Sequence, residues 1–211
     1  MKKITKITIL LSMAMVWSMA AMQAQELTKS FKESFEVKAD AEVNISNKYG
    51  QVIIQSWDKN QVAVNVEVRV DAGSEKESQR VLDKINVKIS GTNTSVKAFT
   101  DFSGKLDCKN CQLEIIYDVK MPATGSLILA NEFGNADVGS LQGNTDFTIA
   151  YGNLDLDELN GKNNIIRLKF GDAEASFLKA ADVNVEYGNL EVRKAGYINL
   201  YSRFSGLEVG E

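Results

Sequence analysis

The sequence YGNLDL at residues 151–156 decides the predicted fold, because the chain repeats it. Five other copies keep the leading aromatic residue and the alternation that follows it. They are YGQVII at 49–54, FGNADV at 133–138, FGDAEA at 170–175, YGNLEV at 187–192 and FSGLEV at 204–209. From residue 133 onward the leading aromatic residues are 18, 19, 17 and 17 residues apart. This period, with strand-like alternation, predicts a mainly β protein whose body is a parallel right-handed β-helix, or β-solenoid, with coils of about 17–19 residues.

Aligning the copies on the aromatic residue gives each position a structural role. The residues four before it, and three and five after it, are apolar in all six copies. We expect them to face a core that also buries the aromatic rings, because a spacing of two keeps side chains on one face of a strand. Glycine follows the aromatic in five copies, where we expect corners with positive φ. The small polar residues that come next either pair with the backbone at the bend or stack from copy to copy as an amide ladder. The corner glycines are Gly50, Gly134, Gly152, Gly171 and Gly188.

An acidic column lies four residues after the aromatic. Stacked copies would place its carboxylates in an outward ladder with roughly 5 Å between neighbours. The ladder is a solvated face, a site for a divalent cation such as calcium, or a pair of carboxylates for glycan hydrolysis. The uniformity of the column and the absence of histidine favour the solvated face. The ladder consists of Asp137, Asp155, Glu174, Glu191 and Glu208.

The first 24 residues are typical of a secretory signal peptide. Three lysines precede an apolar run at 9–22, which is short for a membrane span. Removing 1–24 takes away three lysines and no acidic residue, so 21 of the 24 basic residues remain against 28 acidic ones. The mature net charge of about −7 makes nucleic acid an improbable partner. We expect secretion across an inner membrane to the periplasm, the outer surface or the medium.

The mature chain divides into two regions. Residues 25–120 form an N-terminal β-rich region with a short α-helix near 75–84, where Ser74 and Glu77 have the spacing of a capping box. Residues 121–211 form the β-helical repeat region, which we expect to be continuous with the first. The two cysteines, Cys108 and Cys111, favour a small disulfide in an oxidising compartment; metal binding or redox chemistry are the alternatives.

The chain also resembles a known group of proteins. The secretory signal, ISNKYGQVII at 45–54, the helical insertion and YDVKMPATGSLILANEFGNADV at 117–138 followed by tandem copies occur together. This combination is similar to the secreted, adhesin-like β-repeat proteins of Gram-negative bacteria, over nearly the whole mature chain. The resemblance implies an extracytoplasmic β-helical protein without enzymatic activity, and it brings no catalytic residues.

We therefore expect a non-enzymatic structural or binding module of the cell envelope that presents a face of the solenoid to a surface glycan or an envelope protein. No catalytic residue, metal ligand or cofactor is predicted beyond calcium at the acidic ladder. The alternative is a carboxylate-dependent glycosidase or lyase that acts on acidic polysaccharide. The last copy, at 204–209, ends two residues before Glu211. Either the chain continues beyond this point or two copies of the protein associate end to end through this coil.

Overall fold

The computed structural model describes residues 26–107 and 110–210. The predicted signal peptide lies outside these residues, and so does Cys108, so the signal peptide and the disulfide both stay predictions. The elements are β1 (Leu27–Glu36), β2 (Glu42–Lys48), β3 (Val52–Trp57), β4 (Gln61–Asp71), α1 (Glu75–Leu82), β5 (Ile85–Gly91), β6 (Ser95–Phe102), β7 (Gln112–Pro122), β8 (Ser126–Glu132), β9 (Ala136–Val138), β10 (Thr145–Ala150), β11 (Leu154–Leu159), β12 (Asn164–Lys169), β13 (Ala173–Glu186), β14 (Asn189–Arg203) and β15 (Gly206–Val209).

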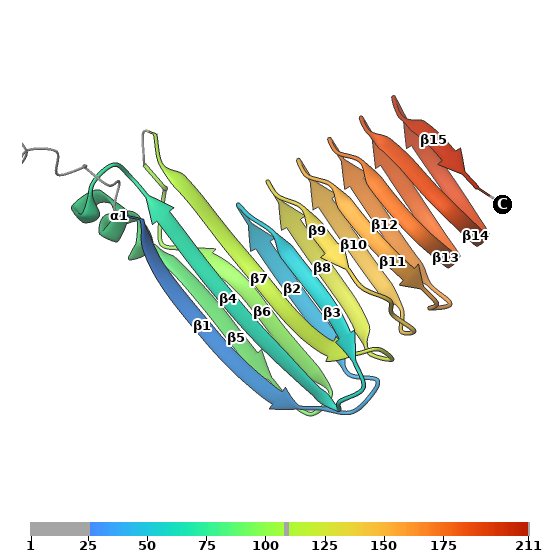
Figure 1. Ribbon diagram of the computed structural model, residues 1–211, viewed down its shortest axis with the longest axis horizontal. Helices are drawn as coiled ribbons and strands as arrows, with labels where there is room; N and C mark the ends of the chain where they lie inside the picture. The colour runs from blue at the N-terminus through green and yellow to red at the C-terminus, as the bar shows by residue number, and fades with distance from the viewer. Residues whose placement is uncertain (1–25, 108–109, 211) are drawn as a thin grey trace, which may run out of the picture.

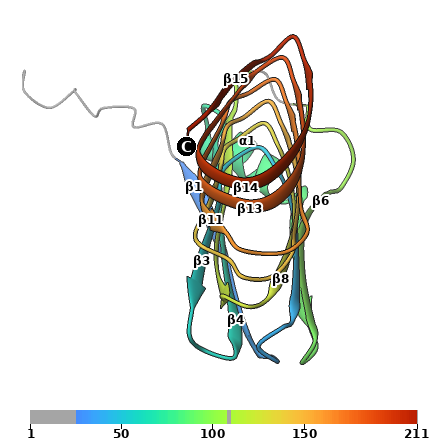
Figure 2. The same cartoon turned by 90° about the vertical axis from the view of Figure 1, so that its right-hand side faces the viewer.

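The strands form one 15-stranded sheet. Its order is β1-β4-β7-β3-β9-β11-β13-β12-β10-β8-β2-β6-β5, with β14 paired to β13 and β15 paired to β14. The pairs β1–β4, β4–β7 and β5–β6 are antiparallel, whereas the strands of the repeated motif pair in parallel. The sheet folds back on itself into a nearly closed barrel of two facing layers (Figures 1 and 2).

The predicted parallel right-handed β-helix is therefore wrong. Strands β13 and β14 have 14 and 15 residues and run from one layer into the other, so the two layers are parts of one mixed sheet. At the other end the early strands pair as antiparallel neighbours, which a β-helix does not contain. The 17–19-residue period gives the distance between successive corners. It does not report the direction in which the earlier strands pair or where a strand bends between layers.

The copies nevertheless lie in direct register. Leu154 is opposite Ala136 on one side and Ala173 on the other, and this relation continues from copy to copy. The three apolar columns are buried between the layers as far as Val192 and belong to one continuous core. The column four residues before the aromatic illustrates this, with at most 3% of each residue exposed. Its buried members are Ile45, Leu129, Phe147, Ile166 and Val183.

The corner glycines are needed for a close approach between copies rather than for a special backbone angle. A Cβ on Gly152 would lie 2.0 Å from the carbonyl oxygen of Gly134, and a Cβ on Gly134 would lie equally close to that of Gly50. Of the five corner glycines, only Gly50 has a positive φ, at 144°. The prediction of positive φ at the glycines is wrong for the other four, because the preceding aromatic residue takes the left-handed conformation instead.

These aromatic residues form a ladder along one edge of the barrel. Successive rings stack with centroids 4.9–5.4 Å apart and planes within 16° of parallel, and each residue has φ between 52° and 68°. A left-handed conformation costs about 1–2 kcal/mol per residue, which a stacked pair worth about 0.5–1.5 kcal/mol largely offsets. The predicted burial of the rings is wrong, since Tyr151 is 50% exposed. The aromatic ladder is Tyr49, Phe133, Tyr151, Phe170, Tyr187 and Phe204.

A polar ladder runs beside the glycines. The Oδ1 of Asn135 accepts from the backbone N–H of Asn153 at 2.9 Å, and the Oδ1 of Asn153 accepts from that of Asp172 at 3.0 Å. Asp172 repeats the contact with the N–H of Asn189 at 2.8 Å. The small polar residues thus pair with the backbone of the next copy, as the sequence predicted.

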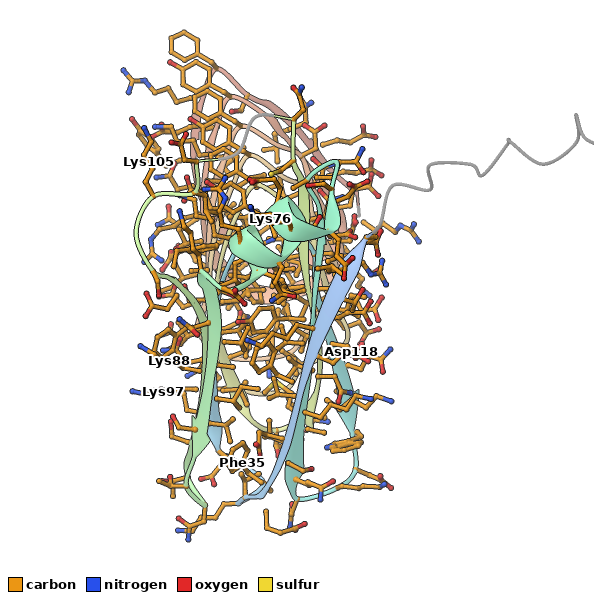
Figure 3. All side chains as sticks on the ribbon, turned by 90° about the vertical axis from the view of Figure 1, so that its left-hand side faces the viewer. Phe35, Lys76, Lys88, Lys97, Lys105 and Asp118 are labelled. Atoms are coloured by element: carbon orange, nitrogen blue, oxygen red, sulfur yellow. The ribbon has the colours of Figure 1, made fainter. Side chains whose placement is uncertain are left out.

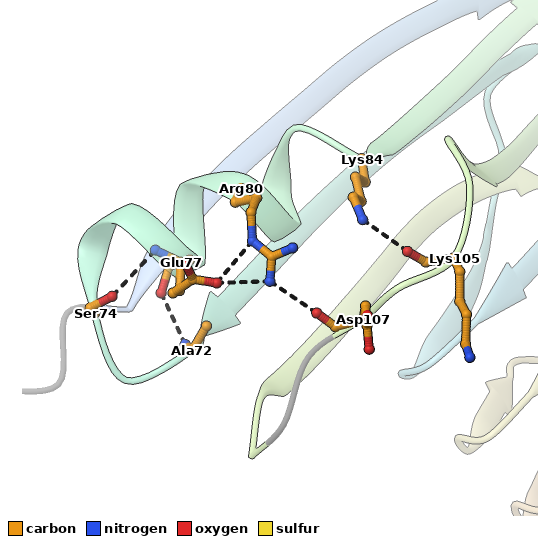
Figure 4. A network of polar contacts seen from close by, with 8 residues as sticks. Ala72, Ser74, Glu77, Arg80, Lys84, Lys105 and Asp107 are labelled. Atoms are coloured by element: carbon orange, nitrogen blue, oxygen red, sulfur yellow. Dashed lines mark hydrogen bonds and ion pairs between the residues drawn. The ribbon is translucent and has the colours of Figure 1, made fainter.

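Helix α1 lies at the N-terminal end of the barrel, within the range that the sequence predicted. The Oγ of Ser74 accepts from the N–H of Glu77 at 3.3 Å and caps it. Arg80 donates to the carbonyl of Asp107, and Lys84 to that of Lys105, both at 2.9 Å (Figure 4). At the same end, the ring of Phe35 on β1 packs against Gly91 on β5 and closes the gap between the two edge strands (Figure 3). In the part of the chain described, no helix is long and apolar enough to cross a bilayer.

We expect Gly152→Ala to lower the free energy of unfolding by at least about 2 kcal/mol, because its methyl group would collide with the backbone of Gly134. Gly73 is the matched control, since it has φ of 76° but nothing within 4 Å of an added Cβ. Gly73→Ala should cost only the conformational strain of about 1 kcal/mol. Urea unfolding of both variants measures the difference. Equal losses of unfolding free energy would show that the close approach to Gly134 is not what requires glycine at position 152.

Tyr117 should make stability depend on alkaline pH. Burial raises the pKa of this phenol to about 12, and its hydroxyl bonds Thr100 Oγ1 at 2.8 Å. Unfolded tyrosine has a pKa near 10, so the contribution of the neutral Tyr117 side chain to folding stability is complete below about pH 10 and is lost as the pH rises through about 12. The loss should approach about 3 kcal/mol. Denaturant unfolding at increasing pH should show this decline in the parent protein, and Tyr117→Phe should lack it.

Candidate functional site

An elongated hollow lies on the outer face of the layer that contains β3, β9, β11, β13 and β14. Its volume is about 570 Å³. We call it the acidic groove, because carboxylates dominate its charged lining and Arg193 is the cation among its lining residues. The charged lining residues are Asp137, Asp155, Asp157, Glu174, Glu191 and Arg193.

The acidic ladder forms the floor of this groove. Asp137 is directly opposite Asp155, which is opposite Glu174, and the same relation links Glu174 to Glu191 and Glu191 to Glu208. Neighbouring parallel strands are about 4.8 Å apart. The register therefore brings the five predicted carboxylates into one row. Four of them line the groove, while Glu208 on β15 lies beyond its end.

Two side chains of the row share a proton-dependent contact. The pKa of Asp155 is raised, first by burial, then by a hydrogen bond to Asp137, and further by the charges of Asp137 and Glu174. Asp137 also accepts a hydrogen bond from the side-chain amide of Gln51. The folded state therefore favours the protonated form of Asp155 at the inner end of the groove, whereas Glu174 and Glu191 continue the row towards β15.

The opposite layer has a different charge pattern. Its acidic side chains make ion pairs across neighbouring strands, including Arg167 with Asp146 at 2.5 Å and Lys48 with Glu132 at 2.9 Å. Among the described residues, no ion pair involves a carboxylate of the acidic ladder. Negative potential is therefore concentrated at the groove, where charges lie close together and partly out of water.

A second hollow of about 420 Å³ extends the groove across β7 and β4 towards β1. It shares Ile53 and Gln55 with the acidic groove, so the two form one continuous depression. Its lining includes Lys32, Arg69 and Asp118, and Figure 3 places Asp118 on this outer face. The depression is thus acidic at one end and mixed in charge at the other.

Neither metal binding nor glycan hydrolysis gains support from this geometry. Within residues 26–107 and 110–210, no group of three or more His, Cys, Asp or Glu side chains is arranged to hold a metal ion. The carboxylates form a uniform row across successive strands and not the single facing pair that a glycosidase uses. The calcium site stays a prediction.

The sequence pointed to the carboxylates of the groove but missed Arg193, which lines it, and Gln51, which contacts Asp137. Gln51 stands in the small polar column, where four of the other copies have asparagine or aspartate, and its greater length lets it reach Asp137. Arg193 follows Val192 at an outward position and enters the groove from β14. The alternation of the strand could have identified Arg193 as outward-facing. The contact of Gln51 depends on the meeting of strands far apart in sequence.

No protein-family model and no curated protein matches the chain. Among solved structures it is similar to a "putative cell adhesion protein" from Clostridium sporogenes, with 12% identity, a TM-score of 0.46, and coverage of 86% of this chain and 99% of the other. A "putative adhesin" from Bacteroides fragilis has 12% identity and a TM-score of 0.37, covering 86% and 97%. One from Parabacteroides distasonis has 13% identity and a TM-score of 0.32, covering 85% and 97%. The function proposed below rests on this chain's own surface.

Replacing Asp155 by asparagine should stabilise the protein at neutral pH. Because the folded state raises the pKa of Asp155, the contribution of its protonated form to folding stability is complete below the unfolded pKa. This contribution is lost as the pH rises through the folded pKa. Asparagine removes this charge and keeps a donor for Asp137. Thermal unfolding from pH 3 to pH 8 should show a higher Tm for Asp155→Asn at pH 7 and a smaller difference in acid. A lower Tm at pH 7 would contradict repulsion within the row.

Proposed function

We propose that this chain is a non-enzymatic binding module, exported from the cytoplasm, whose acidic groove holds a cationic segment of a surface or envelope protein. The observation that carries the proposal is the row of carboxylates in one hollow, with Arg193 as the cation in its lining. Like charges opposite each other on neighbouring strands are destabilising. A cationic ligand would relieve that repulsion, which makes it the partner of complementary charge.

The shape of the groove favours an extended ligand. The row crosses successive strands at about 4.8 Å per strand, so the carboxylates present acceptors at regular intervals along one line. Lysine and arginine side chains of an extended polypeptide can reach such acceptors with charge-assisted hydrogen bonds. Ile53 and the neighbouring Ile116 add an apolar patch where the depression turns towards β7.

Glycan ligands are less compatible with the two ladders. An acidic polysaccharide would bring negative charge to a row that is already negative, so the predicted glycosidase or lyase would repel its own substrate. The aromatic ladder does not provide a platform for neutral sugars along its length, because each inner ring has its faces covered by its two neighbours. These features support binding of a basic polypeptide over glycan binding or hydrolysis.

The test is binding of a short fluorescent oligolysine peptide, with oligoglutamate as the reversed-charge probe. We expect saturable binding of oligolysine that weakens with salt, and a loss of about tenfold or more in Asp155→Asn/Glu174→Gln. The matched control is Asp40→Asn/Glu42→Gln, which removes the same charge on the β2 side of the barrel. Its affinity should remain within about twofold of the parent.

Three results would contradict the proposal. Equal losses in the two double variants would mean that oligolysine responds to net charge and not to the groove. Turnover of a uronate-rich polysaccharide, lost in Asp155→Asn, would favour the enzyme. A saturable rise in Tm with millimolar calcium, lost in Asp155→Asn/Glu174→Gln, would favour the cation site.

A further inference from the structure

One end of the barrel, among the residues described, is formed by β15 and residues 196–203 of β14. Within the described residues β15 pairs with β14 alone, and 196–203 pair only with β13. The end therefore presents two unpaired strand edges, one in each layer, that meet at the corner occupied by Phe204. Figure 2 shows β14 and β15 at this end of the barrel. Unpaired edges are templates for pairing with another strand.

The core is also uncovered at this end. Leu207 is 50% exposed and Val209 is 44% exposed, whereas Leu190 and Val192, which stand one copy earlier in the same columns, are at most 2% exposed. Phe204 is the last ring of the aromatic ladder and is 72% exposed. Apolar surface of this kind, beside open backbone donors, marks an interaction surface.

The backbone of β15 has donors available for a partner. Gly206 and Gly210 donate to the carbonyls of Gly188 and Val192, at 3.2 and 2.8 Å. Because N–H groups alternate in direction along a strand, those of Leu207 and Val209 point to the open side.

We propose that this end binds the same end of a second copy of the chain, giving a closed twofold dimer. Residues 196–203 run towards the Phe204 corner, and β15 runs away from it in the other layer. A twofold axis along the strands through this corner exchanges the layers. It therefore places β15 of each copy antiparallel to 196–203 of the other, and the two Phe204 corners meet. Both open edges are paired in one step, as an isologous contact requires.

The charges at this end are complementary under that rotation. Pairing that keeps the apolar residues inward sets Leu207 opposite Ser202 of the second copy and Glu208 opposite Tyr201. Glu208 then has Arg203 of the second copy as a diagonal neighbour, at roughly 7–8 Å between Cα atoms and within reach of a long side chain. Neither Arg203 nor Glu208 makes an ion pair among the residues described. The rotation forms this pair twice.

The opposite end of the barrel does not offer the same surface. There Phe35 fills the space between the edge strands β1 and β5, and α1 covers the adjoining core with Val81 and Leu82. Strands β1 and β5 are also paired on one side only, but neither exposes a large apolar side chain among the residues described. Growth by alternating ends is therefore disfavoured, and a dimer that closes on itself is the expected product.

Sedimentation equilibrium of the mature protein over a concentration series tests the proposal. We expect a monomer–dimer equilibrium with no larger species. Arg203→Glu and Glu208→Lys should each raise the dimer Kd about tenfold, and the double variant should return it to within about threefold of the parent. Lys97→Glu makes the same charge change as Arg203→Glu but lies on the outer face of β6 (Figure 3), so its Kd should match the parent.

A second variant tests backbone pairing at the edge of β15 independently of the Arg203–Glu208 charge pair. Val209→Pro removes a donor that faces the open side and leaves the Gly210 bond to Val192 in place, so it should abolish the dimer while the Tm changes little. Monomer alone up to about 1 mM would overturn the proposal, because an association of about 4 kcal/mol would then have been detected. Open-ended oligomers that grow with concentration, or a double charge variant that stays weak, would overturn the twofold arrangement.

Discussion

The fold depends on the contact between each corner glycine from Gly134 to Gly188 and the carbonyl oxygen of the corner glycine one copy earlier. With hydrogen in place of a side chain at Gly134 and Gly152, successive backbones meet at a separation that admits no methyl group. This contact fixes the register, and a slip by one residue would turn every apolar side chain of a strand to the outside. The aromatic residue then takes the left-handed conformation, and its ring is carried onto the ring of the next copy. The aromatic, polar and acidic ladders all follow from this one approach.

The same register gives the two layers different surfaces. On the layer of β8, β10 and β12, acidic and basic side chains of neighbouring strands form ion pairs, such as Lys48 with Glu132 and Arg167 with Asp146. On the layer of β9, β11 and β13, the opposed residues of the acidic ladder all have the same sign, and Asp155 retains its proton to a higher pH than an isolated aspartate. Stability alone would favour mixed signs on both layers. The persistence of one sign on one layer is therefore the feature that carries the proposed function.

Local patterns predicted the columns well and the global arrangement poorly. Alternation identified the buried residues, and the cap at Ser74 identified the helix, because both depend on neighbours within a few residues. The mixed barrel was missed because antiparallel pairing of β1 with β4, and the passage of β13 from one layer to the other, depend on long-range contacts. At the groove the carboxylate row was predictable from the period. Its hollow shape and the reach of Gln51 were not, because they require the three-dimensional packing of β3 against β9.

In-register copies also allow the protein to change length without redesign. Each of the four copies between residues 133 and 192 has its own corner glycine, ring, small polar residue and carboxylate, so duplication or loss of one of these copies, with its 17–19 residues, would preserve every column. The groove would lengthen or shorten by about 4.8 Å per copy, while both ends of the barrel stay as they are. The spacing of successive carboxylates thus acts as a molecular ruler, on which related chains could differ in reach by whole units of their sequence.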